Sequence, residues 1–389
     1  MKVTNNTRLL NWRCAILAAL LASGSFPTAA ASLQLVSMRN PSFAPSASGG
    51  GDSGLPILSA DGRFVLFAST ADNLVLTSSH PIPALYPARL NVFLRDRTSG
   101  ATALVSVDST GTGGGNENSI PVAISSNGRF ALFESSSSNL VAADNNNAND
   151  IFVRDLVTGT TLLVSTVADG RSGNGASRDS VMTPDGRYVA FVSEVTNLVA
   201  GDTNQIPDVF LRDLQAGTTT LVSVGSRSAN SSTVASSSEG PGITADGRYV
   251  VFYSTATNLV SGVTTTGEVY VRDLAAGTTT WASANARTVL QSVMGSTTGA
   301  AAYNQVISVD GKFVAFEASA FPIGSSFARG VILRCELQTG LNEIVHTNAD
   351  VAFEPYENIH NLDMTPDGRF VAFAANVGGT SGTSTAIYF

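Results

Sequence analysis

The stretch TPDGRYVAFVSEVTNLV at residues 183–199, followed by DVFLRDLQAGTTTLVSV at residues 208–224, is one copy of a unit that recurs along the chain. An Asp-Gly-Arg turn, or a near copy of it, marks the start of each unit. The six turns begin at Asp61, Asn127, Asp185, Asp246, Asp310 and Asp367. Self-similarity with a period of roughly 60 residues is typical of arrays of one supersecondary unit.

Each unit predicts four short β-strands. Runs such as Tyr188–Val192 and Val209–Leu211 are rich in β-branched and aromatic residues and are bounded by Gly and Asp, which is typical of strands. Asp-Gly and the later Ala216-Gly217 predict tight hairpins, because Gly takes positive φ without steric cost. Runs such as DGRFVLF lack strict alternation, which predicts strands that are buried on both faces between neighbouring sheets. No stretch of adequate length shows a 3.6-residue apolar period, so helices are not expected.

Six four-stranded antiparallel units favour a closed β-propeller over an open array. The blades are expected at about 52–107, 116–167, 176–224, 237–284, 301–347 and 356–389. The sixth unit ends without an outer strand, whereas LQLVS at residues 33–37 matches outer strands such as TALVS and TTLVS. Residues 32–38 are therefore expected to complete the last blade and close the ring, which removes exposed sheet edges.

A family resemblance follows from these motifs. The pattern (S/T)-x-D-G-R-(F/Y)-V-x-F, followed by a strand ending in L-R-D-L, resembles the WD-like repeats of TolB-type propellers over essentially the whole chain after residue 31. The resemblance implies an exported bacterial six-bladed propeller that serves as a rigid binding scaffold more often than as a catalyst. The fold alone does not settle function. The fifth unit departs from the pattern, with Arg334-Cys335-Glu336-Leu337 in place of the Arg-Asp-Leu run.

The first 31 residues predict an export signal. Lys2, Arg8 and Arg13 form a basic start, Cys14–Leu21 is a short apolar run, and residues 29–31 are three alanines that fit a cleavage site. Residues 32–389 are thus expected to form one domain in the periplasm or outside the cell, without insertion in the membrane.

Composition excludes some classes of partner. Without the signal, 19 basic residues face 30 acidic ones, so the net charge falls from −8 to −11. A chain this acidic is not expected to bind nucleic acid or anionic lipid, since both need a positive surface. Cys335 is the one cysteine after residue 31, so no disulfide within the chain is expected.

The order of the strands predicts two different faces. The Asp-Gly and Thr-Gly turns fall on one face, and they are short and repetitive. The loops between second and third strands, and the links between blades, fall on the other and differ from copy to copy. Examples are residues 69–90, 135–149, 193–207 and 287–303. Because variable loops on a rigid scaffold commonly carry binding, we expect a monomer that binds a protein, peptide or glycan partner on this variable-loop face.

Two of these loops share the spacing Asp-x-Asn-x-x-x-Asp. The candidate metal ligands are Asp144, Asn146 and Asp150 in one loop, and Asp202, Asn204 and Asp208 in the other. Calcium takes six to eight oxygen ligands, and this spacing resembles the start of an EF-hand loop. The loops lack the glycine and the terminal Glu of that motif, so the alternative that Asp and Asn cap turns stays open. No cofactor is required, and calcium is the one candidate.

Catalytic constellations are sparse. Arg-Asp pairs recur at equivalent positions: Arg95-Asp96, Arg154-Asp155, Arg212-Asp213 and Arg272-Asp273. Adjacent strand residues point to opposite faces, so a structural role is expected for these pairs. The histidines, His80, His346 and His360, lie in different units, and no Gly-x-Ser-x-Gly motif lies in a strand–turn–helix setting. A non-catalytic scaffold is the leading hypothesis. A carbohydrate lyase or hydrolase at the channel mouth and a calcium-stabilised structural module are the alternatives.

Overall fold

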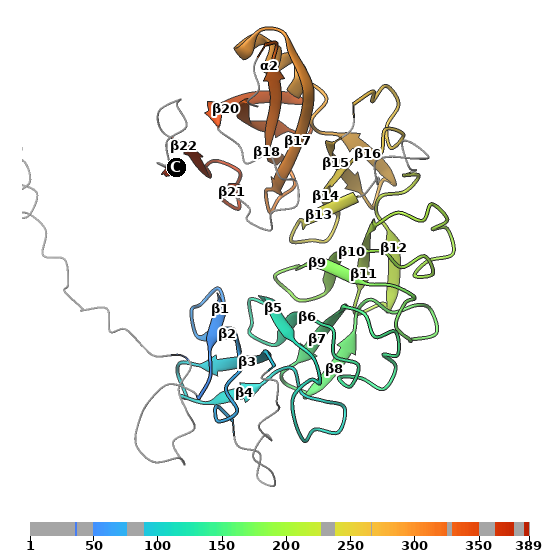
Figure 1. Cartoon of the computed structure of the whole chain (residues 1–389), viewed down its shortest axis with the longest axis vertical. Helices are drawn as coiled ribbons and strands as arrows, with labels where there is room; N and C mark the ends of the chain where they lie inside the picture. Colours follow the sequence, from blue (N-terminus) through green and yellow to red (C-terminus); the bar gives the residue numbers. More distant parts are fainter. Residues whose placement is uncertain are drawn as a thin grey trace, which may run out of the picture. The chain divides into compact units, whose positions relative to one another are not determined.

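The computed structural model describes residue 36 and residues 50–75, 89–226, 238–265, 267–324, 329–349, 362–376 and 385–388. These residues form five four-stranded sheets and one three-stranded sheet, with antiparallel pairing throughout and the strands of each sheet in sequence order (Figure 1). The prediction of an all-β chain of four-stranded antiparallel units is therefore confirmed.

The first three sheets follow one another along the chain. The first contains β1 (Ser53–Leu58), β2 (Phe64–Ser69), β3 (Asn91–Asp96) and β4 (Thr102–Leu104). The second contains β5 (Ser119–Ile124), β6 (Phe130–Ser135), β7 (Asp150–Asp155) and β8 (Thr160–Leu163). The third contains β9 (Ser177–Met182), β10 (Tyr188–Ser193), β11 (Asp208–Asp213) and β12 (Thr218–Leu221).

The last three sheets depart more from the repeat. The fourth contains β13 (Ser238–Ile243), β14 (Tyr249–Ser254), β15 (Glu268–Asp273) and β16 (Thr278–Trp281). The fifth has longer strands, β17 (Thr297–Ile307), β18 (Phe313–Pro322), β19 (Arg329–Glu336) and β20 (Leu341–Ala349). The sixth has β21 (Leu362–Met364), β22 (Val371–Asn376) and β23 (Thr385–Tyr388).

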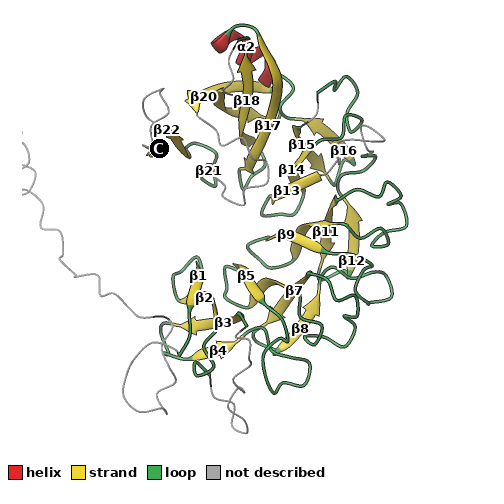
Figure 2. Cartoon of the chain, viewed as in Figure 1, coloured by secondary structure: helices red, strands yellow, loops and turns green. Residues whose placement is uncertain are grey.

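One helix was not predicted from the sequence. Helix α2 (Ala286–Met294) follows the fourth sheet along the chain and contacts β17, β18 and β19 of the fifth (Figure 2), where a loop was expected. Ala286 and Leu290 are buried in the cluster that joins these sheets, and Val289 packs against the same cluster. The spacing i, i+3, i+4 of these three apolar residues is the helical signal that the strand-dominated reading passed over.

The repeated turn explains the sequence motif. In the third sheet, the Thr183 hydroxyl donates to Asp185 Oδ1 at 2.6 Å and accepts from the Tyr188 N–H at 3.0 Å, and Asp185 Oδ1 also accepts from the Arg187 N–H at 3.0 Å. Gly186 has φ 79°, a conformation that favours glycine. A Ser or Thr, an Asp or Asn and a Gly are thus each needed to close the hairpin.

Neighbouring sheets bury a shared apolar layer. Leu66 and Val105 of the first sheet pack with Phe133 and Leu140 of the second, and all four are at most 2% exposed. Similar clusters join each later pair of adjacent sheets. Burying one such aromatic or aliphatic side chain contributes about 1.5–3 kcal/mol. The lack of strict alternation in the central strands follows from this burial on both faces.

The Asp-Gly turns also contact the preceding sheet. A Cβ placed on Gly186 would overlap the ring of Phe130, and one on Gly128 would overlap the ring of Phe64. Each turn glycine therefore lets the backbone approach an aromatic ring of the sheet before it. Phe370 of the sixth sheet holds the same position as Phe130 in its own repeat and is 46% exposed.

The predicted closing strand at residues 32–38 lies outside the described residues apart from Val36. Val36 packs in the cluster that contains Leu74 of the first sheet, as Val105 packs in the cluster that contains Leu140 of the second. Closure of the ring stays a prediction. The proposed export signal also lies outside the described residues. Among the helices that the structure describes, none is both long and apolar enough to cross a membrane.

Candidate functional site

The tight-turn face carries a repeated ion pair. Arg187, just before β10, donates to Asp213 at the end of β11, with Nη2 2.7 Å from Oδ2. Asp213 Oδ1 also accepts from the N–H groups of Gln215 and Ala216 in the following turn. The Arg187 bond is the first cause that holds the pKa of Asp213 below its ordinary value. The same pairing occurs at Arg63–Asp96, Arg129–Asp155 and Arg248–Asp273.

The Arg-Asp dipeptides therefore serve structure. The arginine that precedes each aspartate does not pair with it but reaches the outer strand: Arg212 Nη1 donates to Thr219 Oγ1 at 3.0 Å, and Arg154 Nη1 to Thr161 Oγ1 at 2.9 Å. The acid and base of each dipeptide thus have separate partners on adjacent strands. This arrangement fits the structural role that the sequence pattern predicts.

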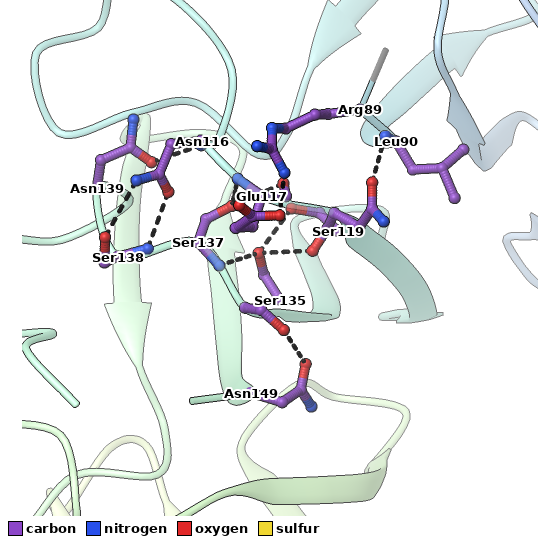
Figure 3. Close-up of polar contacts among 12 residues, drawn as sticks. Arg89, Leu90, Asn116, Glu117, Ser119, Ser135, Ser137, Ser138, Asn139 and Asn149 are labelled. Carbon is purple, nitrogen blue, oxygen red and sulfur yellow. Dashed lines mark hydrogen bonds and ion pairs between the residues drawn. The ribbon is translucent and has the colours of Figure 1, made fainter. Parts of the chain in front are cut away.

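The variable-loop face carries a different repeated network, which the sequence analysis missed. In the second sheet, Asn139 Oδ1 accepts from the Asn116 N–H at 2.9 Å, while Asn116 exchanges bonds with the Ser138 hydroxyl and N–H (Figure 3). In the third sheet Asn174 and Asn197 repeat the bond at 3.1 Å. The signal was the Asn-Leu-Val triplet that follows the second strand of the first four sheets.

The first acidic loop, residues 144–150, lies just before β7. Asp144 is 6% exposed, and no described residue makes a hydrogen bond of normal geometry to either of its carboxylate oxygens, although the Asn146 N–H and the Ser172 hydroxyl lie close enough to lower its pKa in part. Asp150 is fully buried. Its Oδ1 accepts from the Ser165 hydroxyl at 2.5 Å, and its Oδ2 has no partner among the described residues. Three buried carboxylate oxygens in one loop thus lack a hydrogen bond of normal geometry among the described residues.

Burial shifts the titration of both acids. It raises the pKa of Asp144, and it raises the pKa of Asp150 to about 7, with a smaller contribution from the charge of Asp144. The effect of the Asp144 charge on Asp150 indicates that the two carboxylates lie near each other. A divalent cation would reverse the shift, because it stabilises the ionised form of both groups.

The second acidic loop, residues 202–208, repeats the arrangement with fewer unpartnered oxygens. Asp202 is 6% exposed and its Oδ1 has no partner among the described residues. Asp208 accepts from the hydroxyls of Ser223 at 2.5 Å and Ser226 at 2.6 Å, and from Asn204 Nδ2 at 2.6 Å. Burial raises the pKa of both acids, and the charge of Asp208 adds to the shift of Asp202.

The two asparagines serve as turn caps in the structure. Asn146 Oδ1 accepts from the Ala148 N–H at 2.8 Å, and Asn204 Oδ1 accepts from the Ile206 N–H at 3.1 Å. The residue after each asparagine has positive φ, at Asn147 (53°) and at Gln205 (60°). These residues make the sharp turn for which an EF-hand loop uses glycine.

The residues present fit a calcium ion in part. Each loop offers two buried carboxylates, and loop carbonyls and water would have to complete the six to eight oxygens that calcium takes. Among the described residues there is no group of three or more His, Cys, Asp or Glu side chains that could hold a metal. The carboxylates of Asp144 and Asp150 are the stronger candidate ligands, and Asp202 is the next.

The last residue of each loop also has a place in the repeat. Asp150 and Asp208 begin β7 and β11, and Asn91 begins β3 at the same position. Asn91 Oδ1 accepts from the Ser106 hydroxyl at 2.9 Å, as Asp150 does from Ser165. A neutral amide therefore fits this position, which shows that strand pairing alone does not require an acid there.

Other reactive groups stand apart from these loops. His346 on β20 packs against the ring of Phe373 at 5.0 Å, and His80 and His360 lie outside the described residues. Cys335 on β19 is buried, and burial raises the pKa of its thiol to about 11, so its nucleophilic thiolate is scarce at neutral pH. Glu317 on β18 is 2% exposed, and Oε2 has no partner among the described residues.

The sheets and their repeated turns define the blades of a β-propeller. No protein-family model matches the chain. No curated protein matches it either. Solved structures with similarity include a protein described as TolB from Agrobacterium tumefaciens, at 13% identity and TM-score 0.39, covering 77% of this chain and 82% of that one. An oligogalacturonate lyase in complex with manganese has 13% identity and TM-score 0.42, covering 85% and 86%. A structure from work on two prolyl endopeptidases has 12% identity and TM-score 0.45, covering 84% of this chain and 39% of that one.

Proposed function

We propose that the chain is an exported, non-catalytic propeller scaffold that binds a protein, peptide or glycan partner through its variable-loop face. In this proposal, calcium in the two acidic loops fixes the conformation of that face. The observation that supports the calcium step most strongly is Asp144, a buried carboxylate to which no described residue makes a hydrogen bond of normal geometry. A buried charge without a partner is costly, and a bound cation removes the cost.

The loops are well placed to order the face. Asn146 Nδ2 donates to the carbonyl of Gly173 at 3.0 Å, and Ser172 Oγ accepts from the Asn145 N–H at 3.0 Å. The first acidic loop is thus tied to the link that leads into the third sheet. Asn204 Nδ2 donates to the carbonyl of Ser226 at 2.9 Å, which ties the second loop to the next link. A cation in either loop would hold two variable segments in one arrangement.

The distribution of charge supports binding on this face. On the opposite face the repeated arginines and aspartates are paired with one another and with turn N–H groups. The variable-loop face instead holds buried acids, and among the described residues Asp144, Asp150 and Asp202 each have at least one carboxylate oxygen without a hydrogen bond of normal geometry. No comparable observation favours a lyase or hydrolase. The third hypothesis, a calcium-stabilised module, is compatible with the proposal, because the proposal also has calcium in the two loops.

Thermal unfolding of the full chain in calcium, in magnesium and in chelator tests the calcium step. Calcium at a hundred times its dissociation constant should stabilise the fold by ~2.7 kcal/mol. Magnesium should do less, because it demands stricter octahedral geometry. Asp144→Asn should lose the part of the calcium response that comes from the first loop and keep the part from the second, and in chelator it should be more stable than the unaltered protein, because it removes the buried charge.

Asp169→Asn is the matched control, since Asp169 is an exposed acid that pairs with Arg171 outside both loops. It should keep the calcium response. An equal calcium response in Asp144→Asn, or none in the unaltered protein, would contradict the calcium step. The binding step is tested by probing arrays of glycans and peptides with and without chelator. Binding that is indifferent to chelation would contradict the link between the loops and the face.

A further inference from the structure

Two adjoining cavities lie on the variable-loop face between the fourth and fifth sheets. Their volumes are about 230 Å³ and about 140 Å³. They share the lining residues Thr264, Thr265, Arg287 and Ala300. Helix α2 borders both through its first turn, and the larger cavity reaches the beginning of β17. Sites of this size suit a ligand at the small end of the range that proteins bind.

The first turn of α2 offers an anion two kinds of attraction. The N-cap residue, Asn285, makes no side-chain cap bond, and the first turn contains no acidic residue. The N–H groups and dipole at a helix N-terminus favour a negative group. Arg287 in this turn adds a guanidinium to both cavities, and no bond to it is found among the described residues.

An independent feature of the larger cavity also points to a ligand. Thr297, at the start of β17, lines this cavity and is 7% exposed. Its hydroxyl is buried and has no hydrogen-bond partner among the described residues. Buried polar atoms are nearly always satisfied, so a ligand oxygen that accepts from Thr297 would complete the site. Thr264 and Thr298 add further hydroxyls to the same lining.

The charges of the lining select the kind of anion. In the larger cavity, Arg287 is the one charged residue among the described lining residues. Glu268 lines the smaller cavity, where its carboxylate accepts from Thr265, Trp281 and Ser283. One guanidinium, on a chain of net charge −8, matches a singly charged anion better than a dianion.

We infer that this pair of cavities binds a small hydroxylated carboxylate, with the carboxylate on Arg287 and Thr297 in the larger cavity. Arginine pairs well with carboxylates because its donors form a planar fork. The body of the ligand would then extend beside Trp281 in the smaller cavity. The inference rests on the proposed binding role of the variable-loop face and names a ligand class for it; it does not depend on the calcium loops.

Fluorescence of Trp281 provides a direct test. Only Trp12 and Trp281 occur in the sequence, so the full chain with Trp12→Phe reports on the smaller cavity alone. D-glucuronate is the probe, D-glucose tests the need for the carboxylate, and inorganic phosphate tests the choice of anion. D-glucuronate should change the fluorescence with saturation, and glucose and phosphate should bind at least about tenfold more weakly.

Two variants and a control complete the experiment. Arg287→Ala and Thr297→Val should each weaken glucuronate binding, the first by about tenfold or more, since hydrogen bonds to charged groups are the strong ones. Arg171→Ala, which removes one exposed positive charge elsewhere, should leave binding unchanged. Melting temperatures of all variants should match, which separates loss of binding from loss of folding.

Failure to bind glucuronate, equal binding of glucose or phosphate, or an unchanged affinity in Arg287→Ala would overturn the inference. If calcium still stabilises the fold and another glycan or peptide binds on the variable-loop face, the proposed function survives that result. If calcium has no effect and no array ligand binds, the proposed function fails on its own evidence.

Discussion

Replacing Glu317 with glutamine should stabilise the protein above pH 7 and leave its stability unchanged at pH 4. Glu317 lies in the middle of β18, is 2% exposed, and has a carboxylate oxygen without a partner among the described residues. Burial raises the pKa of this carboxyl from 4.5 to about 7, and a hydrogen bond with Asn304 opposes the shift only in part. The folded protein therefore prefers the protonated acid.

The sign and size of the effect follow from proton linkage. Between pH 4.5 and about 7 the folded state holds this proton more tightly than the unfolded state, so the free energy of unfolding falls as pH rises. A shift of this size, at about 1.4 kcal/mol per pH unit, corresponds to a loss of ~3 kcal/mol above pH 7. The stability contributed by the protonated group is fully present below pH 4.5. Glutamine resembles the protonated acid and does not titrate, so the free energy of unfolding of the variant does not fall in this way as pH rises.

Urea unfolding of Glu317→Gln and of the unaltered protein, from pH 4 to pH 8 in chelator, measures the difference. The two stabilities should coincide near pH 4 and separate with a midpoint between pH 5 and 7. Glu194→Gln is the control, because Glu194 is exposed just after β10, and it should stay within about 0.5 kcal/mol of the unaltered protein. Parallel curves for Glu317→Gln and the unaltered protein would refute the reasoning.

Three further predictions concern the scaffold. Asp213→Ala removes two turn hydrogen bonds and the bond to Arg187, and should cost about 1 kcal/mol in urea unfolding after allowance for solvent screening; no loss would contradict the structural role of these pairs. Leu140→Ala should cost about 2–5 kcal/mol by the same assay, because Leu140 is 2% exposed between two sheets, and a small effect would show loose packing there. If the ring is closed, Phe370→Ala should lower the free energy of unfolding as much as Phe130→Ala does. A clearly smaller loss would contradict closure.

The sequence predicted the scaffold well because each repeated residue has one local task. The Ser or Thr, the Asp and the Gly of the turn at residues 183–186 all act within six residues of chain. Six copies of such a local pattern are hard to misread. A structural role was also predicted for the Arg-Asp dipeptides, and their hydrogen bonds agree with it. The sequence did not indicate which residues they pair with. Arg187 and Asp213 lie 26 residues apart, and strand registers were needed to pair them.

The candidate sites were less predictable because their properties depend on burial. The spacing of Asp144 and Asp150 indicated calcium, but it did not show that their oxygens lack donors, which depends on residues such as Ser165 on the outer strand. The same spacing made Asn146 a candidate ligand, although its oxygen caps the backbone at Ala148. Local sequence fixes the turn, and distant packing decides which oxygens are left for an ion.

The cavity beside α2 was beyond sequence reasoning for a related reason. Arg287 and Thr297 are close in sequence, but Thr264 and Trp281 come from the fourth sheet and its loop. The region was expected to be a plain loop, and a loop has no N-terminal dipole. The helix changes Arg287 from a surface charge on a connection into a neighbour of uncapped N–H groups.

Isothermal titration of calcium into the chelator-treated full chain tests the central proposal most directly. The proposal predicts two ions for each chain, one ion in Asp144→Asn, and none when Asp202→Asn is added. The melting temperature should follow the number of bound ions. No heat from calcium in the unaltered protein, or the same number of ions in all three, would contradict it.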